Sequence, residues 1–241
     1  MIKNKLKNSF TDKDGRTYPN VLEYRFEKGE TLYLGKLFAS SHNLDTDEYG
    51  EGIGFYVYED LDNPSIGYRI YREFNNPYDC DEQYNGAFIQ KLQSLQDKIQ
   101  LTEFPYGVIT LDNRVVGQII PIYHDAISLR KYVKDNGMQE DLFLECLLIL
   151  KELCANGIYY LDMNADNFLI TEKGIKLIDF EKHEVDFDKP FSDKCNNVLN
   201  NFKVMLRIIT NNQICEKYSS FINVNTFEEL EEMFKGSKEK K

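Results

Sequence analysis

Residues 157–181 decide the fold of this chain, and they read GIYYLDMNADNFLITEKGIKLIDFE. Two short apolar runs, residues 168–170 and 175–178, flank a polar turn that ends in Gly174. Strands that are joined by a short polar turn with glycine form β-hairpins. The stretch therefore predicts a hairpin.

Three polar side chains stand at the ends of this hairpin. Asp162 and Asn167 precede its first strand and are five positions apart, and Asp179 follows its second strand, twelve positions after Asn167. Carboxylate and amide oxygens are the hard ligands that Mg²⁺ takes, usually together with substrate phosphates. The pattern predicts that Asn167 and Asp179 hold metal and that Asp162 accepts a proton from a hydroxyl group. The competing interpretation is a surface hairpin with incidental acidic residues.

Composition argues against several classes of function. The 241 residues include 29 basic and 40 acidic side chains, which give a formal net charge of -11. Nucleic acids and anionic membranes attract basic surfaces, so we expect neither as a partner. Hydrophobic residues make up 42% of the chain, enough for a core in one or two domains.

The sequence predicts no membrane-spanning segment, no secretory signal and no cysteine-based zinc site. No run approaches the ~18 apolar residues of a membrane-spanning helix, and residues 1–8 lack the apolar centre of a secretory signal. The five cysteines are widely spaced and form no C-x-x-C pair. Such usage predicts no zinc site and is typical of reduced thiols in a cytoplasmic protein.

The pattern of apolar residues predicts an α+β chain with two parts. Residues 1–30 are mixed and polar, with a turn at residues 12–15. Strands are predicted at residues 31–38, 55–58, 66–72, 104–111 and 115–122. Helices are predicted at residues 79–100, 139–156, 198–210 and 227–234, and a short helix follows Ser128 as its N-cap. Gly157 is the residue type that ends helices.

The spacing at the hairpin resembles that of protein-kinase-like phosphotransferases. That family has a catalytic loop H-R-D-x-x-x-x-N followed by D-F-G. Here the corresponding residues are YLD ending at Asp162, then Asn167, and DFE beginning at Asp179. The resemblance covers most of residues 31–210.

This resemblance implies a two-lobed fold and a reaction. Residues 1–122 would form a small N-lobe with an antiparallel β-sheet and one helix, and residues 123–241 a mainly helical C-lobe. The enzyme would transfer the γ-phosphate of ATP, with Mg²⁺, to a hydroxyl of a protein Ser/Thr or of a small molecule. Asp162 would be the base, and Asn167 and Asp179 would hold Mg²⁺.

The family also places a glycine-rich loop, G-x-G-x-x-G-x-V, over the nucleotide phosphates. Gly50, Gly52 and Val57 match this loop, but Phe55 stands at the third glycine position. Glycine matters there because the backbone must approach the phosphates closely. The alternative is a plain flexible loop.

The strand at residues 66–72 lacks the lysine of the family's V-A-I-K motif. It offers Arg69 and Arg72, which face opposite sides because strand side chains alternate. We expect Arg69 to bind the phosphates, since Gly67 leaves room for adenine while Ile70 would crowd a site beside Arg72. The alternative is that both arginines are solvated, and arginine is not equivalent to lysine.

Further nucleotide contacts follow from the same resemblance. Glu82, near the start of the predicted helix, is the candidate partner of the phosphate-binding cation. The backbone of Ile122 and Tyr123, where the lobes would join, is expected to bind the adenine edge. His124 beside them is expected to be a surface residue.

Three departures distinguish the chain from regulated protein kinases. The segment after Asp179 is short and has no A-P-E motif, Asn164 stands where Ser/Thr kinases have lysine, and Glu181 replaces the last glycine of D-F-G. We therefore expect no long activation loop that phosphorylation orders. The chain is more similar to compact bacterial-type or small-molecule kinases, such as choline and aminoglycoside kinase relatives. The alternative function is a pseudokinase that acts as a nucleotide-binding or scaffold module.

Overall fold

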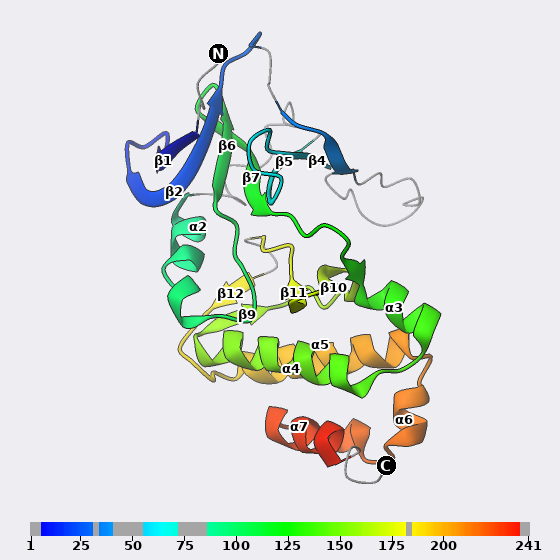
Figure 1. Cartoon of the computed structure of the whole chain (residues 1–241). Coiled ribbons are helices and arrows are strands. Elements are labelled where there is room, and N and C mark those ends of the chain that lie inside the picture. The colour runs from blue at the N-terminus through cyan, green and yellow to red at the C-terminus, as the bar shows by residue number, and fades with distance from the viewer. Residues whose placement is uncertain (1–5, 31–33, 41–54, 72–85, 182–184, 237–241) are drawn as a thin grey trace, which may run out of the picture. The chain divides into compact units, whose positions relative to one another are not determined.

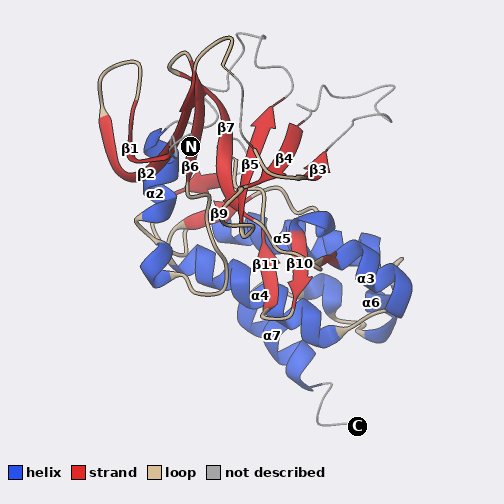
Figure 2. Ribbon diagram, turned by 45° about the horizontal axis from the view of Figure 1, so that its top comes forward, coloured by secondary structure: helices blue, strands red, loops and turns tan. Residues whose placement is uncertain are grey.

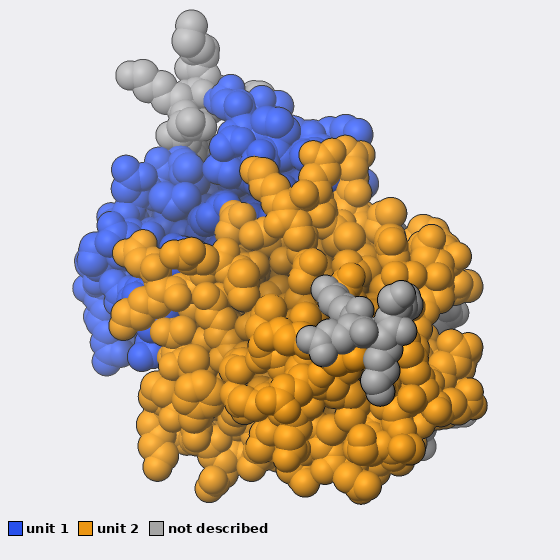
Figure 3. Space-filling model, turned by 60° about the horizontal axis from the view of Figure 1, so that its bottom comes forward, with its two compact units in different colours: residues 1–96, 104–124 blue, residues 97–103, 125–241 orange. Residues whose placement is uncertain are grey.

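The computed structural model describes residues 6–30, 34–40, 55–71, 86–181 and 185–236. The fold is α+β, as predicted. The chain forms two compact units, which Figure 3 colours separately. Residues 1–96 and 104–124 make up the first unit, and residues 97–103 and 125–241 the second.

The first unit is built on a mixed sheet, drawn in Figures 1 and 2. Its described strands number seven and follow the order β1-β2-β6-β7-β5-β4-β3. They are β1 (Leu6–Thr11), β2 (Thr17–Phe26), β3 (Leu37–Ser40), β4 (Phe55–Glu59), β5 (Ile66–Tyr71), β6 (Gly107–Leu111) and β7 (Arg114–Pro121). The expectation of a purely antiparallel sheet is wrong, because β2 and β6 pair in parallel. The described residues of the long connection between them include β3, β4, β5 and a helix, which gives the chain room to cross over.

The first two strands form a hairpin that the polar sequence did not reveal. The predicted turn at residues 12–15 is confirmed, because Asp12 Oδ1 accepts the N–H groups of Asp14 (3.0 Å) and Arg16 (2.9 Å). The Tyr18 hydroxyl donates to Asp12 Oδ2 at 2.7 Å. This turn network fixes the hairpin where the strand pattern itself is weak.

Two predicted elements of this unit are wrong in extent. Residues 34–36 have no regular structure, and the strand expected at residues 31–38 begins only at Leu37. Residues 79–85 of the helix expected at 79–100 lie outside the described residues, and the rest is α2 (Gly86–Gln93), followed by the 3₁₀ helix η1 (Gln96–Lys98). Ser94 follows the end of α2, and its hydroxyl donates to the Lys91 carbonyl at 2.7 Å, a local bond that competes with helix continuation.

The two faces of the sheet differ in character. One face carries the apolar core of the unit, formed by Tyr24, Phe26, Tyr68, Ile70, Ile109, Val116 and Ile119. Successive strand residues point to opposite faces, so Arg69 lies on the face away from Tyr68 and Ile70. Its neighbours across the strands are Gln118 on β7 and Val57 on β4.

Helices make up most of the second unit (Figure 2). They are α3 (Leu129–Asn136), α4 (Glu140–Ala155), α5 (Lys194–Ile209), α6 (Gln213–Lys217) and α7 (Phe227–Gly236), with the 3₁₀ turns η2 (Ala165–Asn167) and η3 (Phe221–Asn223). Short strands complete it: β8 (Ile127–Ser128), β9 (Ile158–Tyr160), β10 (Phe168–Thr171), β11 (Gly174–Leu177) and β12 (Val185–Phe187). No helix among the described residues has the length and apolar character that a membrane span requires.

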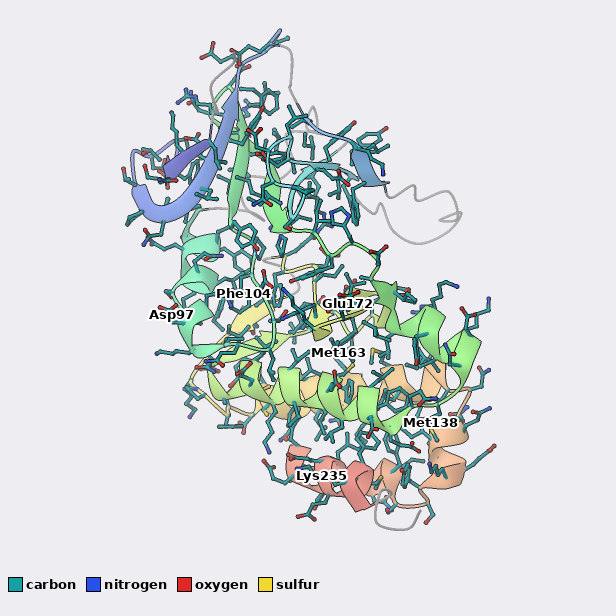
Figure 4. The ribbon with its side chains drawn as sticks, viewed as in Figure 1. Asp97, Phe104, Met138, Met163, Glu172 and Lys235 are labelled. Atoms are coloured by element: carbon teal, nitrogen blue, oxygen red, sulfur yellow. The ribbon has the colours of Figure 1, made fainter. Side chains whose placement is uncertain are left out.

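The predicted hairpin is confirmed as β10 and β11, which pair antiparallel from Phe168 opposite Leu177 to Thr171 opposite Gly174. Figure 4 labels Glu172 in its turn. Two local predictions also hold. The Ser128 side chain caps α3 by accepting from the Lys131 N–H, and Gly157 follows α4 with φ of 75°. A Cβ at Gly157 would lie 2.3 Å from the Asp188 carbonyl oxygen. Both the positive φ and this close approach therefore require glycine at the position.

Candidate active site

The loop between β9 and β10 holds Asp162 and Asn167 together. The Asn167 side-chain nitrogen Nδ2 donates to Asp162 Oδ2 at 2.8 Å and to the Tyr160 hydroxyl at 2.8 Å. An amide nitrogen carries two hydrogens, so both are used, and Asn167 is buried. The amide is therefore fixed in one orientation, in which Oδ1 is the atom that a cation would take.

Local hydrogen bonds explain why residues 162–167 fold into a tight loop. The Asn164 N–H donates to the Asp162 carbonyl at 2.8 Å, and the Asn167 N–H donates to the Asn164 carbonyl at 3.0 Å. The Asn164 side chain accepts the Asp166 N–H at 3.1 Å, which begins η2. Figure 4 labels Met163 in this loop. The short turn brings a carboxylate and an amide five positions apart into direct contact.

Tyr160 joins the entrance and the exit of the hairpin. Its hydroxyl, besides accepting from Asn167, donates to the Ile178 carbonyl at 2.9 Å and lies 3.3 Å from the Asp179 carbonyl. The ring is fully buried and packs edge-on against Phe180 at 5.4 Å. We predicted no role for Tyr160 from its sequence position. The available signal was a tyrosine two positions before Asp162, since a tyrosine that becomes buried needs a polar partner for its hydroxyl.

Asp179 adopts a backbone conformation that is uncommon for residues other than glycine. Its φ is 67°, two residues after the end of β11 at Leu177, and Phe180 and Glu181 after it are buried. Asp tolerates this left-handed region better than most residues, and such conformations cluster at functional sites. Asp179, which the sequence predicted as a metal ligand, is one of eight described non-glycine residues with a positive φ.

Few protein ligands are present for a metal ion. Within the described ranges, no group of three or more His, Cys, Asp or Glu side chains is placed to hold one. Asn167 and Asp179 would supply two oxygen donors, a number that suits Mg²⁺ when substrate phosphates and water complete its coordination. This donor set fits Mg²⁺ that shares its coordination with phosphate oxygens.

Arg69, the predicted phosphate ligand, is buried on β5 of the first unit rather than solvated. Its guanidinium carbon lies 4.2 Å from the centre of the Phe55 ring and 5.5 Å from that of Tyr71. Aromatic faces at such distances attract a cation. Gly50, Gly52, Arg72 and Glu82 lie outside the described residues.

Part of the segment predicted to bind adenine already forms contacts within the first unit. The Ile122 N–H donates to the Ser65 carbonyl at 2.9 Å, so this group does not serve the adenine edge. A Cβ at Gly67 would lie 2.7 Å from Ile122 Cγ1, so the space that we assigned to adenine is filled in part by Ile122. Tyr123 is half-buried beside it. His124 Nε2 lies 2.9 Å from the Pro64 carbonyl, on the surface as expected.

Comparisons with known proteins supply no relative. The chain matches no protein-family model and no sequence among curated proteins. The structure itself brings Asp162 and Asn167 into contact, and it links both to the backbone of Asp179 through Tyr160. These residues, all within the second unit, are the basis of the function proposed below.

Proposed function

We propose that the chain is a protein-kinase-like phosphotransferase that moves the γ-phosphate of Mg-ATP to a hydroxyl group. The observation that carries this proposal is the fixed Asp162–Asn167 pair at the entrance of the hairpin, with Asp179 in a left-handed conformation at its exit. A two-lobed arrangement, with residues 1–122 and 123–241 as its lobes, is part of the proposal.

In this reaction the acceptor oxygen forms a bond to the γ-phosphorus while the bond from that phosphorus to the β–γ bridging oxygen breaks. Asp162 takes the proton of the acceptor hydroxyl, and ADP leaves. Asn167 supports Asp162 because its amide nitrogen donates to the carboxylate and fixes its direction. Most of the rate would come from such positioning and from charge neutralisation, as is usual for phosphoryl transfer.

Asn167 Oδ1 and the Asp179 carboxylate are the groups that would hold Mg²⁺. The bound ion would neutralise the charge of the β- and γ-phosphates. Tyr160 would hold these two ligands in fixed positions, since its hydroxyl contacts both the Asn167 side chain and the Asp179 carbonyl. Arg69 is the proposed phosphate-binding cation of the first unit.

The surroundings of Arg69 favour one other candidate function, a pseudokinase that binds nucleotide or scaffolds a partner without transfer. The guanidinium packs on Phe55 and Tyr71, and a cation that is stabilised by aromatic rings contributes to folding whether or not phosphate is present. The phosphotransferase and a nucleotide-binding pseudokinase differ in turnover, whereas a pseudokinase that only scaffolds a partner would also lack nucleotide binding.

Mg-ATP is expected to raise the melting temperature of the protein. A ligand that binds only the folded state stabilises it by about 2.7 kcal/mol at a concentration one hundred times its Kd. The measurement is a thermal melt with millimolar Mg-ATP, and with ATP plus EDTA as the control. A melting temperature that is identical in all conditions would contradict the phosphotransferase and a nucleotide-binding pseudokinase, and it would leave a scaffold.

Replacing Tyr160 with phenylalanine is expected to weaken Mg-ATP binding, because it releases the Asn167 amide and the backbone around Asp179. The matched control is Tyr159→Phe on the same strand. The Tyr159 ring is also fully buried, and its hydroxyl donates to the Lys189 carbonyl (2.6 Å) and accepts from the Ser192 N–H (2.9 Å).

Each variant loses one buried hydroxyl and is expected to lose about 1–3 kcal/mol of unfolding free energy in urea titrations. Only Tyr160→Phe should also lose affinity for Mg-ATP in calorimetry. If both variants bind Mg-ATP as the unmodified protein does, Tyr160 has no part in the site.

A further inference from the structure

Arg130, in the first turn of α3, reaches the loop that contains the candidate base. Its Nε donates to Asp166 Oδ2 at 2.6 Å, and its Nη2 donates to Asn164 Oδ1 at 3.0 Å. These acceptors lie 36 and 34 positions away in sequence. One planar guanidinium thus binds two side chains that lie between Asp162 and Asn167, in a fixed geometry that lysine does not reproduce.

The Asp166 carboxylate is also bound by Ser128, the residue that caps α3. Ser128 lies opposite Leu169 in the pairing of β8 with β10, and β10 begins directly after Asn167. The Ser128 hydroxyl donates to Asp166 Oδ1 at 2.9 Å and also accepts the Lys131 N–H that caps α3. Both oxygens of the Asp166 carboxylate are therefore bound from the start of α3.

The contact coincides with a departure from the kinase pattern. Asn164 stands where Ser/Thr kinases have lysine, so residues 162–167 contain no cation of their own. The Asn164 amide oxygen instead receives the guanidinium of Arg130, together with the Asp166 N–H. A positive charge is thus supplied to this loop from a neighbouring helix.

We propose that Arg130 is a positioning residue for the proposed phosphotransferase, which holds the loop of residues 162–167 through Asn164 and Asp166. This inference rests on the proposed function and adds to it a residue that fixes the loop between Asp162 and Asn167. Arg130 and Asp166 are half-exposed, at 47% and 48% of their side-chain surface. Exposed ion pairs contribute little to folding, so the expected consequence of losing Arg130 is a looser loop in a protein that remains folded.

The test compares Arg130→Ala, Asp166→Ala and the double variant with Lys131→Ala. Lys131 is the matched control because its ammonium forms an exposed ion pair with Asp135 on the same helix, at 2.7 Å. Two quantities are measured: hydrogen–deuterium exchange of residues 162–167, and kcat with the KM for ATP. All variants should melt within a few degrees of the unmodified protein.

Arg130→Ala and Asp166→Ala are expected to exchange faster in residues 162–167 and to lower kcat by about 10–10²-fold, the scale of a misplaced catalytic group. The KM for ATP should not change. The double variant should lose less than the product of the single losses, since both residues act through one network. Lys131→Ala should match the unmodified protein in both measurements.

Exchange that stays unchanged in Arg130→Ala overturns the proposal, whether or not the protein transfers phosphate. Faster exchange with unchanged kcat also overturns the positioning role. If the unmodified protein transfers no phosphate while Arg130→Ala exchanges faster, the proposed function fails, the positioning role in catalysis fails with it, and only the anchoring of the loop stands.

Discussion

Asp162→Asn is expected to lower turnover by about 10²–10⁴-fold, the range for loss of a positioned general base. The substitution keeps the shape of the side chain and leaves an oxygen that can accept the Asn167 amide hydrogen. It removes the basicity that takes the proton of the acceptor hydroxyl. Affinity for Mg-ATP should stay the same, because Asp162 is not one of the proposed metal ligands.

The measurements are the initial rate of ADP formation and calorimetric titration with Mg-ATP, both compared with Asp135→Asn. Asp135 is an exposed aspartate of α3 whose carboxylate pairs with Lys131 at the surface. This control makes the same chemical change away from the site and should leave the rate unchanged. A variant at Asp162 that turns over as fast as the control would remove the base from the mechanism.

Asp179→Asn is expected to reduce both Mg-ATP affinity and turnover, the latter by at least ~10²-fold, the scale of one lost electrostatic contact to a transition state. Asparagine is the informative substitution here because it tolerates the left-handed φ of 67° at this position. Alanine would add backbone strain to the loss of the carboxylate. In EDTA, where no Mg²⁺ is available, Asp179→Asn and the unmodified protein should bind ATP with equal affinity.

The contrast between the two substitutions separates the proposed roles. A base affects turnover alone, whereas a metal ligand affects binding and turnover together. Stability in urea should be similar for both variants, because both side chains are only partly buried. If Asp179→Asn binds Mg-ATP as tightly as the unmodified protein does, Asp179 is not a ligand of the ion.

Local sequence patterns predicted the parts of the fold that local interactions determine. The β10–β11 hairpin follows from two apolar runs and a turn, and the cap at Ser128 follows from the preference of serine for that position. The parallel pairing of β2 with β6 depends instead on segments more than 80 residues apart, such as Leu22 opposite Gly107. No periodicity in either strand carries that information.

In the candidate site, too, contacts between residues close in sequence could be predicted and contacts between distant residues could not. The five-residue spacing of Asp162 and Asn167 was readable because the short turn η2 connects them directly. The contacts of Tyr160 with the hairpin exit and of Arg130 with Asp166 join residues that are distant in sequence. These contacts form only in the folded second unit, so the sequence pattern does not show them.

The most direct test of the central claim is a paired measurement of phosphate transfer from Mg-ATP with and without the carboxylate of Asp162. The purified protein and Asp162→Asn are incubated with γ-labelled Mg-ATP, with water and the protein's own hydroxyl groups as acceptors. Free phosphate and labelled protein are then quantified at equal nucleotide occupancy. We predict transfer by the unmodified protein and a loss of about 10²-fold or more in the variant. Equal transfer by both would contradict the claim that Asp162 is the base, and no transfer by either despite bound Mg-ATP would contradict the enzymatic account and leave a nucleotide-binding module.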